Sequence, residues 1–155
     1  MRKEKIKIYL DTSVYNRPFD DQRQDRIKLE TEAFLLILEK VLSGGILLFG
    51  SSTLIYENSK NPFTERKERV SSYISIASKI IKLNEAIRQK ALIFEEAGID
   101  PIDSLHLGHT EYSPADYFIT CDDILIKKMN KKKDLTKFEI CNPIEFVVKE
   151  VFKNA

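Results

Sequence analysis

The sequence Lys5-Ile6-Lys7-Ile8-Tyr9-Leu10-Asp11 decides the fold of this chain. Ile6, Ile8 and Leu10 alternate with polar or aromatic neighbours, which predicts a short β-strand that ends at Asp11. Apolar residues at helical spacing then predict a long amphipathic helix over about 21–42. A strand followed by a helix is the opening of the strand–helix–strand unit from which parallel sheets are built.

Strands and helices continue to alternate along the rest of the chain. Further strands are expected over residues 46–50, 115–121 and 138–141. Helices are expected from 51 or 52 through 57, from 61 with Ala77 on its apolar face, over 84–98, and from residues 101, 123 and 143. We therefore expect a three-layer α/β/α architecture with a central parallel sheet, in a single domain spanning residues 1–155.

The composition is that of a globular protein, with 43% hydrophobic and 32% charged residues. No apolar run approaches the length of a membrane span, and the N-terminus lacks the apolar region of a signal peptide. The two cysteines, Cys121 and Cys141, make a disulfide framework or a structural zinc site improbable. These observations predict a cytoplasmic protein without a membrane partner.

Charge is balanced overall but unevenly distributed. There are 25 Lys and Arg against 24 Asp and Glu, so no global basic field indicates a nucleic-acid partner. Five lysines nevertheless crowd together at positions 127, 128, 131, 132 and 133. Such a cluster is most often a solvated surface, but Lys127 and Lys128 are also candidates for contact with a nucleic-acid backbone.

The acidic residues are placed where chemistry is expected in an α/β sheet. Asp11 ends the first strand, Asp122 follows the strand over 115–121, Glu57 lies after the strand over 46–50, and Asp103 is in the first turn of a helix. Ligands of open α/β sheets bind beyond the carboxyl ends of the strands. If the first strand neighbours the strand over 115–121, these carboxylates converge at one edge of the sheet.

Each carboxylate also has a simpler structural interpretation. Asp11 and Asp122 could cap helices, Asp103 could complement a helix dipole, and Glu57 could be exposed to solvent. Four carboxylates at one edge would repel each other and require a cation. Oxygen ligands of this kind suit Mg²⁺ or Mn²⁺ better than zinc.

Other common types of catalytic site find little support. The glycines match neither a dinucleotide-binding fingerprint nor a phosphate-binding loop, and no serine lies in a G-x-S-x-G turn. Cys121 is better explained as a small packed residue than as a nucleophile. His106 and His109 could share a ligand at i and i+3 of one helix, but packing and hydrogen bonding are the favoured explanation, and we leave both out of the site.

Four motifs resemble those of PIN-domain nucleases, the fold of VapC-type toxin ribonucleases, in the order of that family. The opening motif is similar to Ile8-Tyr9-Leu10-Asp11-Thr12-Ser13-Val14, and the second to Leu54-Ile55-Tyr56-Glu57. The third resembles Ile102-Asp103-Ser104-Leu105-His106-Leu107, and the fourth Tyr117-Phe118-Ile119-Thr120-Cys121-Asp122. Ser104 and Gly108 stand where the family usually has alanine. Each motif is weak alone, whereas the ordered set is specific.

The resemblance implies that Asp11, Glu57, Asp103 and Asp122 form a catalytic quartet that binds Mg²⁺ or Mn²⁺, with Thr120 in support. It leaves open whether Asp123 shares this role, how many metal ions bind, and whether the target is RNA or DNA. The expected function is a metal-dependent endoribonuclease with an RNA substrate, with an antitoxin protein as a candidate partner and a homodimer as the expected assembly. The alternatives are a non-catalytic PIN-like module that binds RNA or protein, and a metal-dependent phosphatase.

Overall fold

The computed structural model describes residues 4–154, so residues 1–3 and 155 of the expected domain lie outside the described residues. Its centre is one five-stranded sheet in the order β3-β2-β1-β4-β5, in which every neighbouring pair is parallel. The strands are β1 (Ile6–Leu10), β2 (Ile46–Ser51), β3 (Lys79–Ile81), β4 (Tyr117–Ile119) and β5 (Glu139–Cys141). The predicted α/β/α class with a central parallel sheet is confirmed.

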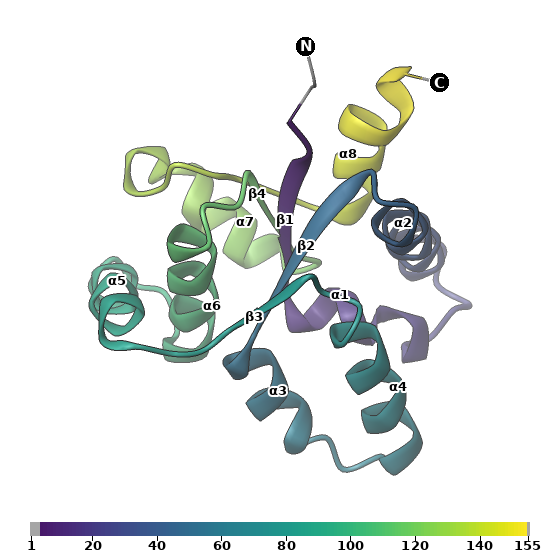
Figure 1. Cartoon of the computed structure of the whole chain (residues 1–155), viewed down its shortest axis with the longest axis horizontal. Coiled ribbons are helices and arrows are strands. Elements are labelled where there is room, and N and C mark those ends of the chain that lie inside the picture. The colour runs from purple at the N-terminus through teal and green to yellow at the C-terminus, as the bar shows by residue number, and fades with distance from the viewer. Residues whose placement is uncertain (1–3, 155) are drawn as a thin grey trace.

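Helices cover both faces of the sheet, as Figure 1 shows, with α5, α6 and α7 on one side and α2 and α8 on the other. The α-helices are α1 (Thr12–Asn16), α2 (Asp25–Leu42), α3 (Ser52–Ser59), α4 (Thr64–Ile74), α5 (Glu85–Glu96), α6 (Pro101–Tyr112), α7 (Asp123–Asn130) and α8 (Pro143–Phe146). Short 3₁₀ turns η1 (Arg17–Phe19) and η2 (Lys133–Leu135) follow α1 and α7. The last predicted helix continues beyond α8 as a π-helical turn, η3 (Val147–Val151), and a 3₁₀ turn, η4 (Phe152–Asn154).

Several helices begin directly after a residue whose side chain caps the first turn. The side chains of Ser51, Asn84 and Asn142 each accept a backbone N–H of the helix that follows. Asp11 and Asp122 do the same for α1 and α7. These residues accept the backbone N–H groups that the first turn of a helix leaves unpaired, and for α3, α5, α7 and α8 the predicted starts agree with the structure.

Two elements were not predicted, and one helix is shorter than expected. Helix α1 directly follows Asp11. Strand β3 follows the turn after α4, and two of the three residues of this strand are exposed. Helix α4 starts at Thr64 rather than at residue 61, and it ends at Ile74, so Ala77 lies outside it. Ala77 still packs against the core, because the chain turns back towards β2, where Ser78 N–H donates to Leu48 O at 2.9 Å.

The core lies between the sheet and its helices, and β1 runs through its middle. Ile8, Tyr9 and Leu10 are fully buried, as are Phe118 and Ile119 on the neighbouring strand. Helix α6 packs closely on α5 at Gly108, where an added Cβ would lie only 2.9 Å from the backbone oxygen of Ile87. Even the alanine common in the resembling family would therefore be crowded at this position. In the part of the chain that the structure describes, no helix is long and apolar enough to cross a membrane.

Candidate functional site

The strand order reverses between β1 and β4, and the candidate site lies at that point. The chain proceeds from β1 to β2 and β3 on one side, whereas β4 and β5 lie on the other side of β1. The backbone N–H of Asp11 donates to Ile119 O at 2.9 Å, so the ends of β1 and β4 are held together. The two strands are neighbours, so the condition for the carboxylates to converge at one edge is met, and this is where α/β sheets bind ligands.

Asp11 is the most tightly held carboxylate of the site. It is 6% exposed, and its Oδ1 accepts the Thr12 backbone N–H at 2.8 Å. Its Oδ2 accepts the Thr120 hydroxyl at 2.8 Å and the Ser13 hydroxyl at 3.0 Å. Three donors from two strand ends therefore fix the position of this carboxylate, while the lone pairs not used by them remain available.

Asp103 and Asp122 both line a small pocket of about 30 Å³. Asp122 Oδ1 accepts the backbone N–H groups of Ile124 and Leu125, at 3.0 and 3.1 Å, at the start of α7. Asp103 is half-buried in the first turn of α6. Burial, followed by the charges of Asp11 and Asp122, raises the pKa of Asp103 to about 6. The three aspartates are thus close enough for their charges to interact.

Glu57 belongs to the same region but is held by different partners. Its Oε1 accepts the Thr12 hydroxyl at 2.5 Å and also contacts His106 Nε2. Burial acts to raise the pKa of Glu57, but the hydrogen bond and charge of His106 outweigh it, so the pKa lies below its ordinary value. Burial likewise acts to lower the pKa of His106, and the bond to Glu57 with the charges of Asp11 and Asp103 raises it overall.

The four predicted carboxylates therefore lie in one region of the molecule, but they do not converge on a single point as the ligands of one metal ion would. Within residues 4–154, no three His, Cys, Asp or Glu side chains are placed so that they could together hold a metal ion. One oxygen of Glu57 is bound by His106, and one oxygen of Asp122 caps α7. The donors present are carboxylate and hydroxyl oxygens, and this chemistry fits Mg²⁺ or Mn²⁺.

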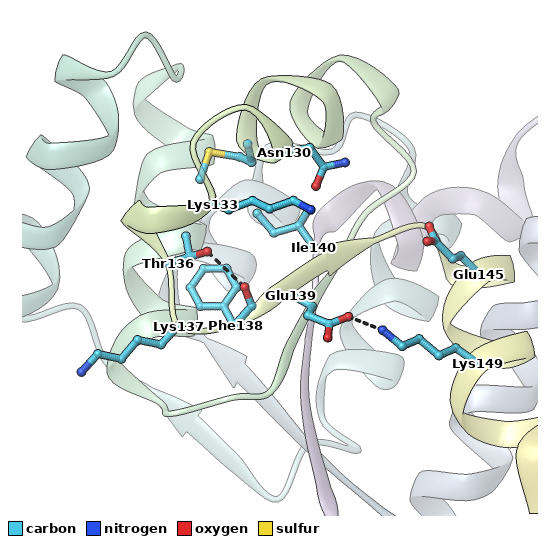
Figure 2. Close-up of a pocket in the computed structure, with 10 residues that line it drawn as sticks. Asn130, Lys133, Thr136, Lys137, Phe138, Glu139, Ile140, Glu145 and Lys149 are labelled. Atoms are coloured by element: carbon cyan, nitrogen blue, oxygen red, sulfur yellow. Dashed lines mark hydrogen bonds and ion pairs between the residues drawn. The ribbon is translucent and has the colours of Figure 1, made fainter.

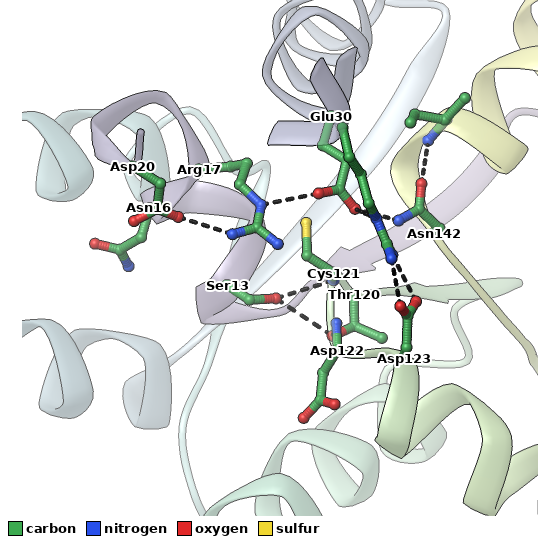
Figure 3. Close-up of polar contacts among 12 residues, drawn as sticks. Ser13, Asn16, Arg17, Asp20, Glu30, Thr120, Cys121, Asp122, Asp123 and Asn142 are labelled. Atoms are coloured by element: carbon green, nitrogen blue, oxygen red, sulfur yellow. Dashed lines mark hydrogen bonds and ion pairs between the residues drawn. The ribbon is translucent and has the colours of Figure 1, made fainter. Parts of the chain in front are cut away.

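The neighbouring side chains of Asp122 and Asp123 point in different directions, as Figure 3 shows. Both carboxylate oxygens of Asp123 accept hydrogen bonds from the Arg26 guanidinium. Asp123 is the first residue of α7, where the sequence predicts that a helix begins. Its carboxylate forms an ion pair with Arg26 of α2.

A second polar network lies behind the site and joins α2 to its neighbours (Figure 3). Glu30 is fully buried and is paired with Arg17 Nε at 3.0 Å and with Asn142. Cys121 lies in the same region and is 6% exposed. Burial raises the pKa of its thiol to about 12, which supports its interpretation as a packed residue rather than a nucleophile.

The histidines are buried and hydrogen-bonded, as expected, but the sequence did not reveal what His106 touches. His106 and His109 are both fully buried on α6. His109 Nε2 lies 2.8 Å from the Thr53 hydroxyl, and burial lowers its pKa to about 4. His106 instead contacts the site through Glu57. The only available signal was its place three residues after Asp103 on the same helix.

The lysine cluster flanks the site along α7. Lys127 and Lys128 are exposed in the last turn of that helix, and Lys128 Nζ donates to Gly98 O at 3.3 Å. Lys128 also lines the small pocket with Asp103 and Asp122. A separate groove of about 580 Å³ lies farther on, beside the edge strand β5, and is lined by Lys133, Lys137 and the Glu139–Lys149 ion pair (Figure 2). This groove shares no lining residue with the acidic site.

Comparison with known proteins identifies the fold. No protein-family model matches the sequence, and the search of curated proteins gave no match. A chain in the crystal structure of VapBC2 from Rickettsia felis bound to a promoter DNA fragment has a TM-score of 0.58 and 18% identity, over 88% of this chain and 98% of that one. A chain in the crystal structure of DNA-bound VapBC from Salmonella typhimurium has a TM-score of 0.50 and 16% identity, over 89% and 98%. The chain therefore has the fold of these VapBC chains, and the predicted PIN-like fold is confirmed.

Proposed function

We propose that this protein is a Mg²⁺- or Mn²⁺-dependent endoribonuclease that hydrolyses phosphodiester bonds in RNA. The observation that carries the proposal is the group of interacting carboxylates at the point where the strand order reverses. Among the described ion pairs, none involves Asp11, Asp103 or Asp122, so these three carboxylates are not held by direct ion pairs. A divalent cation is the natural counterion for such a group.

Asp11, Asp103, Asp122 and Glu57 are the residues that would hold the cation. When bound, a divalent ion polarises a phosphoryl oxygen and lowers the pKa of its bound water. Thr120, Ser13 and Thr12 orient the carboxylates of Asp11 and Glu57 through their hydroxyl groups. Lys127 and Lys128 lie where an RNA backbone could pass the site, and phosphate contacts there would position the strand without reading its sequence.

The likeness to VapBC chains supports a biological setting for this activity. We infer that the protein acts as the toxin of a toxin–antitoxin pair, with an antitoxin protein as partner, and that it forms a homodimer. The VapBC structures were solved with DNA, and their chains cover most of this chain. Size-exclusion chromatography with light scattering of the purified chain tests the dimer, and a monomer across the micromolar range would reject it.

A non-catalytic module that binds RNA or protein is the second candidate. It is favoured by the side chains that already occupy site oxygens, because His106 and Thr12 bind Glu57 and the start of α7 binds Asp122. A metal-dependent phosphatase is the third candidate, since the same cation chemistry acts on small phosphate esters.

Incubation with end-labelled single-stranded RNA, with Mn²⁺ or with EDTA, separates these functions. We expect cleavage only with Mn²⁺, products that carry a 5′-phosphate and a 3′-hydroxyl, and no cleavage by Asp11→Asn. Asparagine retains the cap on α1, so this variant should fold as the wild type does. RNA binding without cleavage would support the binding module. Hydrolysis of p-nitrophenyl phosphate without RNA cleavage would support the phosphatase.

A further inference from the structure

A chain of buried hydrogen bonds leads from the sheet to the Glu57 carboxylate. The Tyr9 hydroxyl lies 2.6 Å from Ser51 Oγ and 2.7 Å from His106 Nδ1, and all three residues are fully buried. The other ring nitrogen, His106 Nε2, contacts Glu57 Oε1. The two nitrogens of His106 therefore meet different partners, a hydroxyl on one side and a carboxylate on the other.

The positions of the hydrogens in this chain follow from what each group can donate. An ionised carboxylate only accepts, so His106 Nε2 must carry a hydrogen. In the neutral imidazole Nδ1 is then an acceptor, and the Tyr9 hydroxyl donates to it. Ser51, whose oxygen accepts the Leu54 N–H at 3.1 Å, is then the donor to the Tyr9 oxygen. In this arrangement every hydrogen from Ser51 to Glu57 has an acceptor, as buried polar groups require.

We propose that Ser51, Tyr9 and His106 are positioning residues for Glu57, and that the buried chain from Ser51 through Tyr9 holds the His106 ring so that its Nε2 donates to Glu57 Oε1. Thr12 donates to the same Glu57 oxygen, so both donors hold Oε1. In the described contacts Oε2 accepts no hydrogen bond, which leaves this oxygen for a cation. The inference rests on the proposed function in that it places Glu57 among the cation ligands.

His109 provides a comparison within the same helix. It is also fully buried, but its Nε2 meets the Thr53 hydroxyl, which can donate or accept. Its Nδ1 has no hydrogen-bond partner among the described residues. The surroundings of His109 therefore do not specify one tautomer, whereas those of His106 do. A histidine buried only for packing resembles His109, and the two partners of His106 go beyond that requirement.

Ring-nitrogen NMR tests the hydrogen position directly, because the chain has only two histidines. In ¹⁵N-labelled full-length protein, at a pH where the imidazoles are neutral, we expect His106 to be the Nε2–H tautomer. Tyr9→Phe should leave the hydrogen on Nε2, because the Glu57 carboxylate still requires it, and should shift the Nδ1 resonance, since that nitrogen loses its hydrogen-bond partner. Tyr117→Phe is the matched control, because it removes a hydroxyl on the neighbouring strand that bonds to Glu150 instead. Wild-type His106 with its hydrogen on Nδ1 would overturn the proposal.

Mn²⁺ affinity, measured from free Mn²⁺ by electron paramagnetic resonance, tests the consequence for Glu57. Changes to residues that orient metal ligands typically weaken affinity by 10–100-fold, so Tyr9→Phe should weaken it by about tenfold and Tyr117→Phe should not. His106→Gln, whose amide can place a donor near the Nε2 position, should retain more affinity than His106→Asn. These two variants carry the comparison if Tyr9→Phe does not fold.

The two measurements separate failure of this inference from failure of the proposed function. Unchanged Mn²⁺ affinity in Tyr9→Phe, or equal affinities of His106→Gln and His106→Asn, would overturn the positioning role while leaving metal binding intact. A wild-type protein that binds no Mn²⁺ would reject the cation site and the role of Glu57 in it. The tautomer of His106 would still decide whether the hydrogen-bond chain exists.

Discussion

At the scale of single residues, the structural interpretation is confirmed for Asp11 and Asp122, and it is compatible with the proposed function of the acidic residues. Asp11 and Asp122 cap α1 and α7, and the same two carboxylates contribute to the charge that surrounds Asp103. A carboxylate can serve both purposes because two oxygens offer about four acceptor positions and a helix cap uses only one or two of them. Capping then fixes the direction in which the remaining lone pairs point.

Asp122 and its neighbour Asp123 give the sharpest test of this interpretation. Asp122→Asn should reduce RNA cleavage by about a hundredfold or more, since it removes a negative ligand, whereas Asp123→Asn should keep most of the activity. Asparagine is as good a cap as aspartate, so Asp122→Asn should not unfold α7. Single-turnover cleavage rates with Mn²⁺ provide the measurement. Equal losses in both variants would mean that Arg26–Asp123 is as important as the acidic site.

The two cysteines allow a second prediction at this scale. Burial raises the pKa of both Cys121 and Cys141 to about 12, and the thiolate is the reactive form. At pH 8, we therefore expect neither thiol of the native protein to react with Ellman's reagent within minutes. In guanidinium chloride both should react at once, which controls for the reagent. Rapid reaction of one thiol in the native protein would contradict the buried environment.

The candidate residues could be predicted from the sequence, but their partnerships could not. Asp11 directly follows an apolar strand, and Asp122 comes two residues after Thr120, the first polar residue beyond another, so the end of each strand is a readable local signal. Glu57 and His106 are separated by 49 positions, and nothing local in either segment indicates the other. Their contact depends on how α3 and α6 pack at the end of the sheet. The contact between Tyr9 and His106 spans 97 positions and is equally invisible in the sequence.

At the scale of elements, sequence patterns identified the long segments but missed the short helix α1 and the short strand β3. Helix α2, with a continuous apolar face, was predicted almost to its ends. Helix α1 has five residues, which is too short for a helical period to be recognised. Strand β3 has three residues, two of them exposed, so neither alternation nor an apolar run marks it. It forms because its backbone pairs with β2, a tertiary interaction that local pattern does not contain.

Helix α7 allows a prediction about nucleic-acid contact. In an Asp11→Asn background, Lys127→Gln/Lys128→Gln should weaken binding to single-stranded RNA of any sequence. Each phosphate contact on a single strand contributes about 0.7 to the slope of log Kd against log salt, so the slope should fall by about 1.4. Fluorescence anisotropy at several salt concentrations measures this.

The matched control for α7 is Lys5→Gln/Lys40→Gln, which removes the same charge from exposed lysines near the opposite ends of the strands. This control should leave the salt slope unchanged. An equal effect of both double variants would indicate a general charge effect, and no effect of either would assign the lysines of α7 to a solvated surface.

At the scale of the whole molecule, the acidic site should cost the metal-free protein stability. The pKa of Asp103 is raised to about 6 in the folded state, above its ordinary value, so the folded protein holds this proton more tightly than the unfolded chain does. Between about pH 4 and pH 6 the free energy of unfolding should therefore fall as the pH rises. Above that window the ionised Asp103 carboxylate remains close to the negative charges of Asp11 and Asp122, and among the described residues no ion pair offsets this repulsion.

Asp103→Asn should remove this dependence because asparagine does not titrate. In EDTA, we expect the variant to melt at a higher temperature than the wild type at pH 7.5 and at the same temperature at pH 4. Glu39→Gln, which changes an exposed carboxylate on α2, should behave as the wild type at both values. Thermal unfolding followed by circular dichroism measures all three proteins. A variant less stable than the wild type at pH 7.5 would show that Asp103 is stabilising where it stands.

The order of the strands also determines when the protein acquires its site during synthesis. β1 is the central strand, yet the partner that completes the acidic edge is β4, and the Thr120 hydroxyl that holds Asp11 comes 109 positions later. A ribosome must therefore translate the chain at least through residue 122, and that segment must leave the exit tunnel, before Asp11 can meet Asp122. Every nascent chain shorter than this lacks the complete site, so chemical competence depends on the emergence of β4, although β1 is synthesised long before it.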